Sequence, residues 1–309
     1  MEEDYQHFWR RYFSVSSPKP ITEINPSISD AGNAFVYQSI FKDLSDYPIF
    51  FKNKNNHYIL SEQNNFFDDN GTIYITGHSH FVNNHFYSFN NSNNRFIYCN
   101  NVNSTVTEGS ISYCINSDSG SLCQHNEQIN IKAVNFSKCK TRWGSAISCL
   151  WVQKVVNVSC CCIDSCHASS FAAVYFESLN ATLIKSNIIN NTHIGSSWGI
   201  IYLSGFSYHK LSIEDCIFQK NCQNKKGPYF STNSYANIYI FHTISDKTTA
   251  YHAEGTIYMS EMTTTSFQND FFICLTSKML IKSIKQNTDI GFDLFSYVHL
   301  FYQIIFSIE

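Results

Sequence analysis

Acidic side chains are the first candidates for chemistry, because two carboxylates that meet across neighbouring strands can act as acid and base on a glycosidic bond. A lyase would also need a Lys or Arg base, and only Arg95 and Arg142 fall within the repeated part of the sequence, both near turns. The acids that share a position of the repeat are two or three repeats apart: Asp164 and Asp246, Glu177 and Glu261, and Glu214 and Asp270. We therefore expect no acids to meet from adjacent repeats, and no catalytic residues.

Cysteines are the second candidates, since the run CCCIDSCH from Cys160 to His167 resembles a cluster of metal ligands. Strand alternation predicts that Cys160 and Cys162 point inward and Cys161 outward, so the three cannot share a tetrahedral site. We expect core packing rather than a metal or a cofactor. Cys139 and Cys166 occupy the same turn position in successive repeats, which is compatible with either a disulfide or a stack of reduced thiols.

A recurring strand phrase positions these residues. It begins at Gly144, Ala172, Gly199, Gly227 and Gly255, which are 28, 27, 28 and 28 positions apart. Such a period, built on β-branched and aromatic residues, is typical of a solenoid whose units bury their apolar faces by stacking. Similar phrases at Gly32, Gly71 and Gly109 are 39, 38 and 35 positions from the next phrase, so we expect longer rungs there.

Alternation within each phrase predicts which side chains point inward. Val174, Ile201 and Ile257 fall in one column that should line a common interior wall. A turn of the form Phe/Ile-x-x-Asn/Cys follows the second strand of most units. We expect its Asn residues to form a buried stack that satisfies turn amides and carbonyls from rung to rung, with members at Asn70, Asn84, Asn191 and Asn221.

Aromatic residues dominate one outward column of the later rungs. If each rung has about 28 residues, Tyr175, Tyr202, Phe230 and Tyr258 lie side by side at strand spacing. Such a stripe can stack on sugar rings or form the centre of a protein contact. The alternative is that the rings stack on one another or are covered by a loop or by the C-terminal tail.

Both ends of the sequence have their own patterns. Tyr5, Phe8, Trp9, Tyr12 and Phe13 follow helical spacing, which predicts a short helix that caps the first rung or, alternatively, lies on a membrane surface. The first residues have acids where a secretory signal has bases. Residues 294–308 are uncharged and apolar, which favours a terminal strand pair over a truncated membrane anchor.

Overall composition narrows the partners. Charged residues are 15% of the 309 residues, the net charge is −3, and there are only four Arg, so nucleic acid is not expected as a partner. The 12 Cys do not fix the compartment.

The paired motifs resemble a known family. FDDN (67–70), FVNN (81–84) and FQKN (218–221) match the Phe-x-x-Asn half of the repeat of polymorphic outer membrane proteins, and GSAI at Gly144 is closest to its Gly-Gly-Ala-Ile half. The Asn- and Cys-rich version is similar to large families of such proteins in trichomonad protists. The resemblance covers residues 32–270. It implies a pectin-lyase-like fold displayed at a cell surface and serving adhesion, with no catalytic residues.

From these observations we predict an all-β, right-handed parallel β-helix with rungs of about 28 residues and a short N-terminal capping helix. Its parts would be a cap segment (1–31), the β-helix (32–275) and a C-terminal cap or tail (276–309). The predicted function is a non-enzymatic, adhesion-type interaction scaffold. Glycans or host-cell surface proteins are its expected partners, and a carbohydrate-active enzyme on the same scaffold is the alternative.

Overall fold

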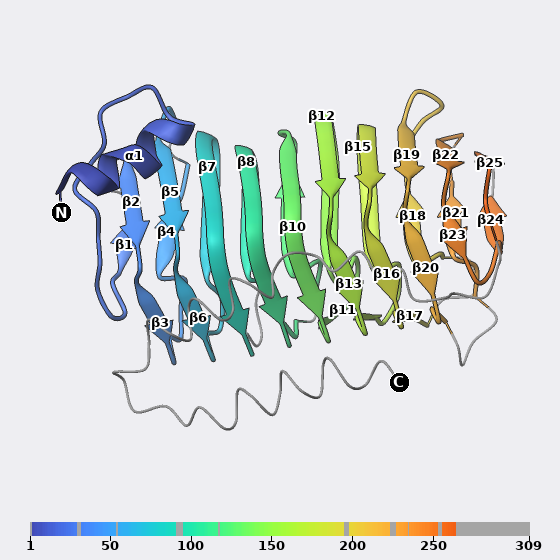
Figure 1. Ribbon diagram of the computed structural model, residues 1–309, viewed down its shortest axis with the longest axis horizontal. Helices are drawn as coiled ribbons and strands as arrows, with labels where there is room; N and C mark the ends of the chain where they lie inside the picture. The colour runs from blue at the N-terminus through green and yellow to red at the C-terminus, as the bar shows by residue number, and fades with distance from the viewer. Residues whose placement is uncertain are drawn as a thin grey trace. The chain divides into compact units, whose positions relative to one another are not determined.

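The computed structural model is an all-β chain whose parallel strands stack into a β-solenoid of about eight turns, with one short helix at the N-terminus (Figure 1). It describes residues 2–263, apart from 30–31, 54, 91–94, 117, 195–197, 223–226, 234 and 253–254. The predicted C-terminal cap or tail (276–309) lies outside the described residues. Among the described residues, no helix has the length and apolar character needed to span a membrane.

Each rung of the solenoid contributes up to three strands, and each strand pairs in parallel with its equivalents in the rungs before and after. The long strands β7 (Ile73–Phe89) and β8 (Ile97–Ser112) bend at the corners and supply all three sides of their rungs. The first strands of the other rungs are β1 (Ile28–Ser29), β4 (Ile49–Phe51), β9 (Leu122–His125), the start of β12 (Ile147–Ser159), the start of β15 (Val174–Ile184), β18 (Ile201–Leu203), β21 (Phe230–Thr232) and β24 (Ala250–His252).

The second strands are β2 (Ala34–Tyr37), β5 (Tyr58–Glu62), the start of β10 (Ile129–Ser137), the ends of β12 and β15, β19 (Lys210–Glu214), β22 (Asn237–Phe241) and β25 (Thr256–Ser260). The third strands are β3 (Ile40–Lys42), β6 (Asn65–Phe67), the end of β10, β13 (Cys162–Asp164), β16 (Asn187–Ile189), β20 (Ile217–Gln219) and β23 (Ile244–Ser245). A separate three-stranded sheet joins β11 (Lys140–Thr141), β14 (His167–Ala168) and β17 (Thr192–His193).

The interior is filled by columns of apolar side chains that run along each side of the solenoid. The first-strand column is buried throughout and consists of Ile49, Ile73, Ile97, Leu122, Ile147, Val174, Ile201 and Phe230. Val174 and Ile201 share this wall as predicted. Ile257 does not, because it pairs with Ile238 in the second-strand column.

The rung length differs from the predicted 28 and is not constant. Ile73 pairs with Ile97, 24 positions later, whereas Ile201 pairs with Phe230, 29 positions later. The phrases at Gly32, Gly71 and Gly109 lie on three different sides, since Ala34 belongs to a second strand, Ile73 to a first strand and Ile111 to a third. The long rungs expected there are therefore wrong, because that expectation placed all three phrases on one side.

One corner keeps its length while another varies. The inward residues that flank the corner between the second and third strands are always five positions apart, as in Ile131 and Phe136 or Leu183 and Ile188. The corner residue itself has a left-handed backbone in each of these rungs, with φ between 45° and 56° at Gln38, Gln63, His85, Glu108, Ala133, Cys160, Lys185, Asp215, His242 and Glu261. The corner between the first and second strands instead varies in length: it spans residues 177–180 in one rung and residues 204–210 in the next.

The predicted helix is present as α1 (Glu2–Tyr12), but it does not sit on the end of the first rung. Its Trp9 side chain packs on an outward apolar column formed by Phe35, Leu60 and Val82 of β2, β5 and β7, so α1 lies across the side of these strands (Figure 1). The free edges of β2 and β3 are met by single parallel bridges from Ile21 and Ile24. The helix therefore covers three apolar side chains that would otherwise be exposed.

Candidate functional site

The predicted aromatic stripe is only half formed. Tyr175 and Tyr202 are neighbours, with ring centroids 5.2 Å apart, as predicted. Phe230 instead pairs with Ile201 and is 0% exposed in the core, and Tyr258 pairs with Tyr239 on another side. The reason is that the rungs after Ile201 have 29 and 20 residues, so a constant period loses the register.

The two tyrosines that do stack are covered. Tyr175 is 9% exposed and Tyr202 only 2%. The Phe171 and Trp198 rings pack over them from the preceding turns, with Trp198 and Tyr202 ring centroids 4.7 Å apart. This matches the alternative in which a loop covers the stripe, and it leaves little of these rings available to a ligand.

Exposed apolar side chains gather elsewhere, at the corner between the first and second strands. Trp151, Phe206, Tyr208 and Tyr235 are each more than half exposed, and Val155 is 39% exposed. They lie within four consecutive rungs, because β12, β15, β19 and β22 pair in that order. We call these five residues the aromatic corner. The loop into β19 projects along the upper edge of Figure 1. Single exposed apolar residues are ordinary, but a group at one corner marks a candidate interaction site.

Two members of the corner, Trp151 and Tyr235, have a left-handed backbone, with φ of 54° and 66°. Asn100 pairs with His125 and His125 with Leu150, so the following residues, Asn101, Asn126 and Trp151, hold the same corner position. All three are left-handed, with φ of 59°, 66° and 54°. Asn tolerates this backbone, whereas for a bulky residue it is an outlier that costs about 1–3 kcal/mol.

The backbone and the neighbours of Trp151 hold its ring in one place. Register shifts on either side of Val152 form a bulge in β12, and bulges re-aim side chains. The indole packs edge-on against His125 with ring centroids 5.5 Å apart. Burial raises the pKa of Glu177, and the Trp151 side chain opposes the rise. Trp151 is thus an exposed but fixed side chain.

The loop that carries Phe206 and Tyr208 is also ordered by specific contacts. Buried His209 donates its backbone N–H to the Phe206 carbonyl at 2.9 Å, and its Nδ1 lies 3.1 Å from the Ser204 carbonyl. Gly205 has φ of 140°, and a Cβ there would lie 1.6 Å from the His209 ring. The Asn237 amide reaches back from the next rung to the Ser207 carbonyl at 3.1 Å. These contacts hold both aromatic rings outward.

The charges at the corner cancel. Between the first and second strands of these rungs and the one before, the charged residues are Glu127, Lys154, Glu177 and Lys210. Lys154 pairs with Glu127 at 2.6 Å. Exposed polar side chains beside the rings are amides and hydroxyls, including Gln153, Asn180 and Ser207.

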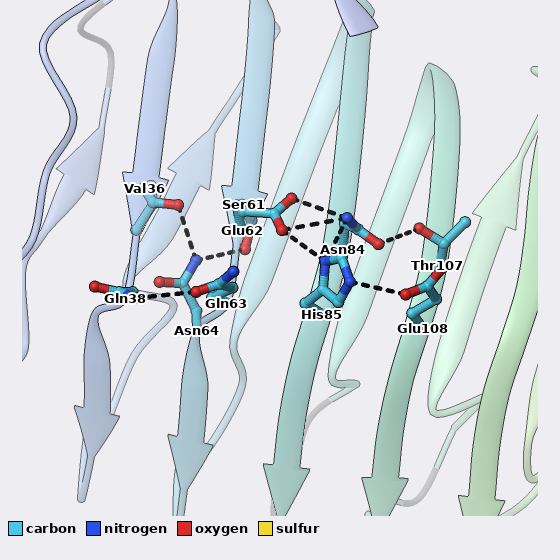
Figure 2. Close-up of polar contacts among 10 residues, drawn as sticks. All are labelled: Val36, Gln38, Ser61, Glu62, Gln63, Asn64, Asn84, His85, Thr107 and Glu108. Atoms are coloured by element: carbon cyan, nitrogen blue, oxygen red, sulfur yellow. Dashed lines mark hydrogen bonds and ion pairs between the residues drawn. The ribbon is translucent and has the colours of Figure 1, made fainter. Parts of the chain in front are cut away.

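Two acids from rungs that are not adjacent meet at one histidine, since Glu62 and Glu108 belong to the rungs before and after that of His85. His85 on β7 lies between Glu62 on β5 and Glu108 on β8 (Figure 2), with Nδ1 2.6 Å from Glu62 and Nε2 2.8 Å from Glu108. Comparing acids at the same position of the repeat did not reveal this group. His85 and Glu108 occupy the same corner position, whereas Glu62 pairs with Asn84, one residue before that corner.

The Glu62 carboxylate is fully buried and fully used. The Asn84 side-chain amide donates to its Oε2 at 2.9 Å, and the side-chain Oδ1 of Asn84 accepts from the Thr107 hydroxyl at 2.6 Å (Figure 2). Tyr12 at the end of α1 packs against the cluster that contains Leu60 and Val82, so the helix lies beside this network. Burial, and then the charge of Glu62, raise the pKa of Tyr12. Because every group is paired, the arrangement neutralises a buried acid beneath the helix rather than presenting a free acid or base.

The cysteine run differs from its prediction. Cys161 points into the core, whereas Cys160 and Cys162 are half-buried. Cys160 is the left-handed corner residue, and it resets the alternation that was extended through it. Cys139 and Cys166 are free thiols. Among the described residues, no three His, Cys, Asp or Glu side chains gather as a metal group.

The buried asparagine stack is confirmed in the later rungs. The Asn191 Oδ1 accepts from the Cys166 N–H at 2.9 Å and its Nδ2 donates to the Ile163 carbonyl at 2.7 Å. Asn221 makes the same contacts one rung later. Asn70 and Asn84 were assigned wrongly: Asp69, one residue earlier, accepts the turn N–H of Leu44 at 2.9 Å, and Asn84 lies in β7.

The sequence-based predictions did not include Trp151, although a signal was present. Trp151 follows Asn126 by 25 positions, and Asn126 follows Asn101 by 25. With the correct period, a Trp in a column of turn-forming Asn would stand out. Comparison of the chain with protein-family models, with curated proteins and with solved structures gave no match.

Proposed function

We infer that this chain is a non-enzymatic interaction scaffold of the adhesion type, displayed at a cell surface, which binds its partner through the aromatic corner. Trp151 carries the proposal: a large apolar side chain is held in solvent at a backbone position that disfavours it. Folding alone does not account for such a residue, since exposure and left-handed backbone both oppose it. Binding energy at an interface would offset both.

The solenoid suits this role because it presents side chains at fixed spacing. Parallel strands about 4.8 Å apart set the distance between successive corners. The corner between the first and second strands varies in length without disturbing the register of β15 and β19, so it can carry projecting residues. The resemblance to surface proteins described above agrees with this arrangement, and glycans or host-cell surface proteins are the partners it suggests.

A triple substitution at the corner tests the proposal. Trp151→Ser, Phe206→Ser and Tyr208→Ser together should abolish attachment of the full chain to cultured animal cells or to immobilised glycans, while the far-UV circular dichroism stays unchanged. Tyr258→Ser, which removes an exposed ring outside the corner, is the matched control and should attach normally. Attachment by the triple variant at the wild-type level would refute the assignment.

The same preparation separates the scaffold from a carbohydrate-active enzyme. Incubation with pectins, alginates and glycosaminoglycans should release no reducing ends and no unsaturated uronates above background. Turnover that survives purification would overturn the non-enzymatic proposal.

A further inference from the structure

We propose that the aromatic corner recognises a neutral glycan. This rests on the proposed function and deepens it by naming the chemical class of the ligand. Three features of the corner support it: the polar side chains that lie among the rings, the balance of charge, and the fixed orientation of Trp151.

Polar side chains lie among the rings of the corner, of which Phe206 and Tyr208 stack on each other with centroids 5.6 Å apart. Exposed Asn180 lies in the rung between those of Trp151 and Tyr208, and exposed Gln153 and Ser207 are each two residues or fewer from a ring along the chain. A sugar has a C–H face that stacks on aromatic rings and a rim of hydroxyls that bond to amides and hydroxyls. A protein hot spot would instead need a closed apolar centre.

The charges at the corner argue against an acidic ligand. Lys154 is paired with Glu127 at 2.6 Å, Glu177 adds a second acid to the corner, and none of the corner residues is Arg. Sulfated or uronic-acid polymers, and anionic lipid surfaces, are bound by clusters of Arg and Lys. Lys210 is the one cation at the corner beside the Lys154 pair, and a single Lys does not make such a cluster.

The orientation of Trp151 reduces the cost of binding. Its indole packs edge-on against His125 and lies beside the bulge in β12, so little side-chain freedom is lost when a ligand stacks on the exposed face. Tyr235 lies three strand steps away, about 14 Å by strand spacing, so a ligand that contacts both must extend over several sugar units along the solenoid axis.

Titration of the full chain with cellohexaose, mannohexaose and N-acetylchitohexaose, followed by tryptophan fluorescence and calorimetry, tests the inference. At least one should bind, and Trp151→Ser should raise its Kd at least about tenfold, as for an interface hot spot. Tyr258→Ser should leave the Kd within about twofold, as for surface positions outside the contact.

Three results would overturn the inference: no binding of these neutral sugars, binding only of heparin, polygalacturonate or phosphatidylcholine vesicles, or neutral-sugar binding that Trp151→Ser leaves unchanged. If the triple corner variant still loses attachment to cells while no neutral sugar binds, the proposed function stands and the glycan assignment falls.

Discussion

Trp151 occupies the corner position that Asn126 holds one rung earlier, and both residues have a left-handed backbone, with φ of 54° and 66°. The neighbouring Asn126 is what this turn ordinarily accepts. The turn itself therefore requires only a residue such as Asn, and the indole of Trp151 serves another purpose than forming this turn.

Trp151→Asn should leave stability unchanged or raise it by up to about 1 kcal/mol, because it relieves the strained backbone and removes an exposed ring. Partner binding should be lost. Urea denaturation of the variant measures the first effect. Loss of more than about 2 kcal/mol would show that Trp151 is a packing residue instead.

Tyr202→Ser should behave in the opposite way. Tyr202 is covered by Trp198 and stacks on Tyr175, so its removal leaves a cavity and should cost about 3 kcal/mol. Tyr258→Ser, at a ring that is 49% exposed, should cost less than about 1 kcal/mol. Thermal denaturation of the pair, read by circular dichroism, distinguishes the buried ring from the exposed one.

Asp69→Asn should stabilise the protein above pH 6 and make little difference at pH 4. Burial raises the pKa of Asp69 to about 6, and its Oδ2 has no hydrogen-bond partner among the described residues. A carboxyl whose folded pKa lies above its unfolded value favours folding while it is protonated, and this contribution is lost as pH rises from about 4 through 6. The expected gain at pH 7.5 is about 1–3 kcal/mol. An equal effect of the substitution at both pH values would contradict this account.

Asn83→Val should raise stability by about 1–3 kcal/mol, because both amide atoms of Asn83 are buried in the core without a partner among the described residues. Val106 already fills the next position of that column. Asn191→Val is the counterpart: it leaves the Cys166 N–H and the Ile163 carbonyl unpaired and should cost at least about 2 kcal/mol. If both substitutions shifted stability in the same direction, hydrogen bonding would not be the cause.

His85→Ala should destabilise the chain by about 3 kcal/mol, since it leaves the buried Glu62 carboxylate with Asn84 alone. Adding Glu62→Gln should restore part of the loss, because the neutral amide can still accept from Asn84. Denaturation of the two single variants and the double variant gives the coupling energy. Additive losses would mean that the two residues do not act together.

The sequence predicted those features that depend on local rules. Alternation placed Val174 and Ile201 on one wall, and the turn motif identified Asn191 and Asn221, because both patterns are read within a single rung and do not depend on its length. Helical spacing identified α1, but not that Trp9 packs on Phe35, Leu60 and Val82, since that column appears only when the strands are in register.

The errors have one physical cause. Extra residues enter at variable corners, and left-handed corner residues reset the alternation, as at Cys160. The assumption of a constant period therefore assigned Phe230 and Tyr258 to the column of Tyr175 and Tyr202, to which neither belongs. The meeting of Glu62, His85 and Glu108 was missed for a related reason, because it joins residues at two different positions of the repeat.

The unequal corners also bear on how such a chain can change. The spacing of five residues from Leu183 to Ile188 is the same as that from Ile213 to Phe218. The corner before Leu211 is longer than the corner before Ala181, yet these two residues still pair. New recognition loops can thus be inserted at the corner between the first and second strands, while the corner between the second and third strands keeps the rungs in register. Transplanting 204–209 between rungs should relocate the binding determinant along the axis.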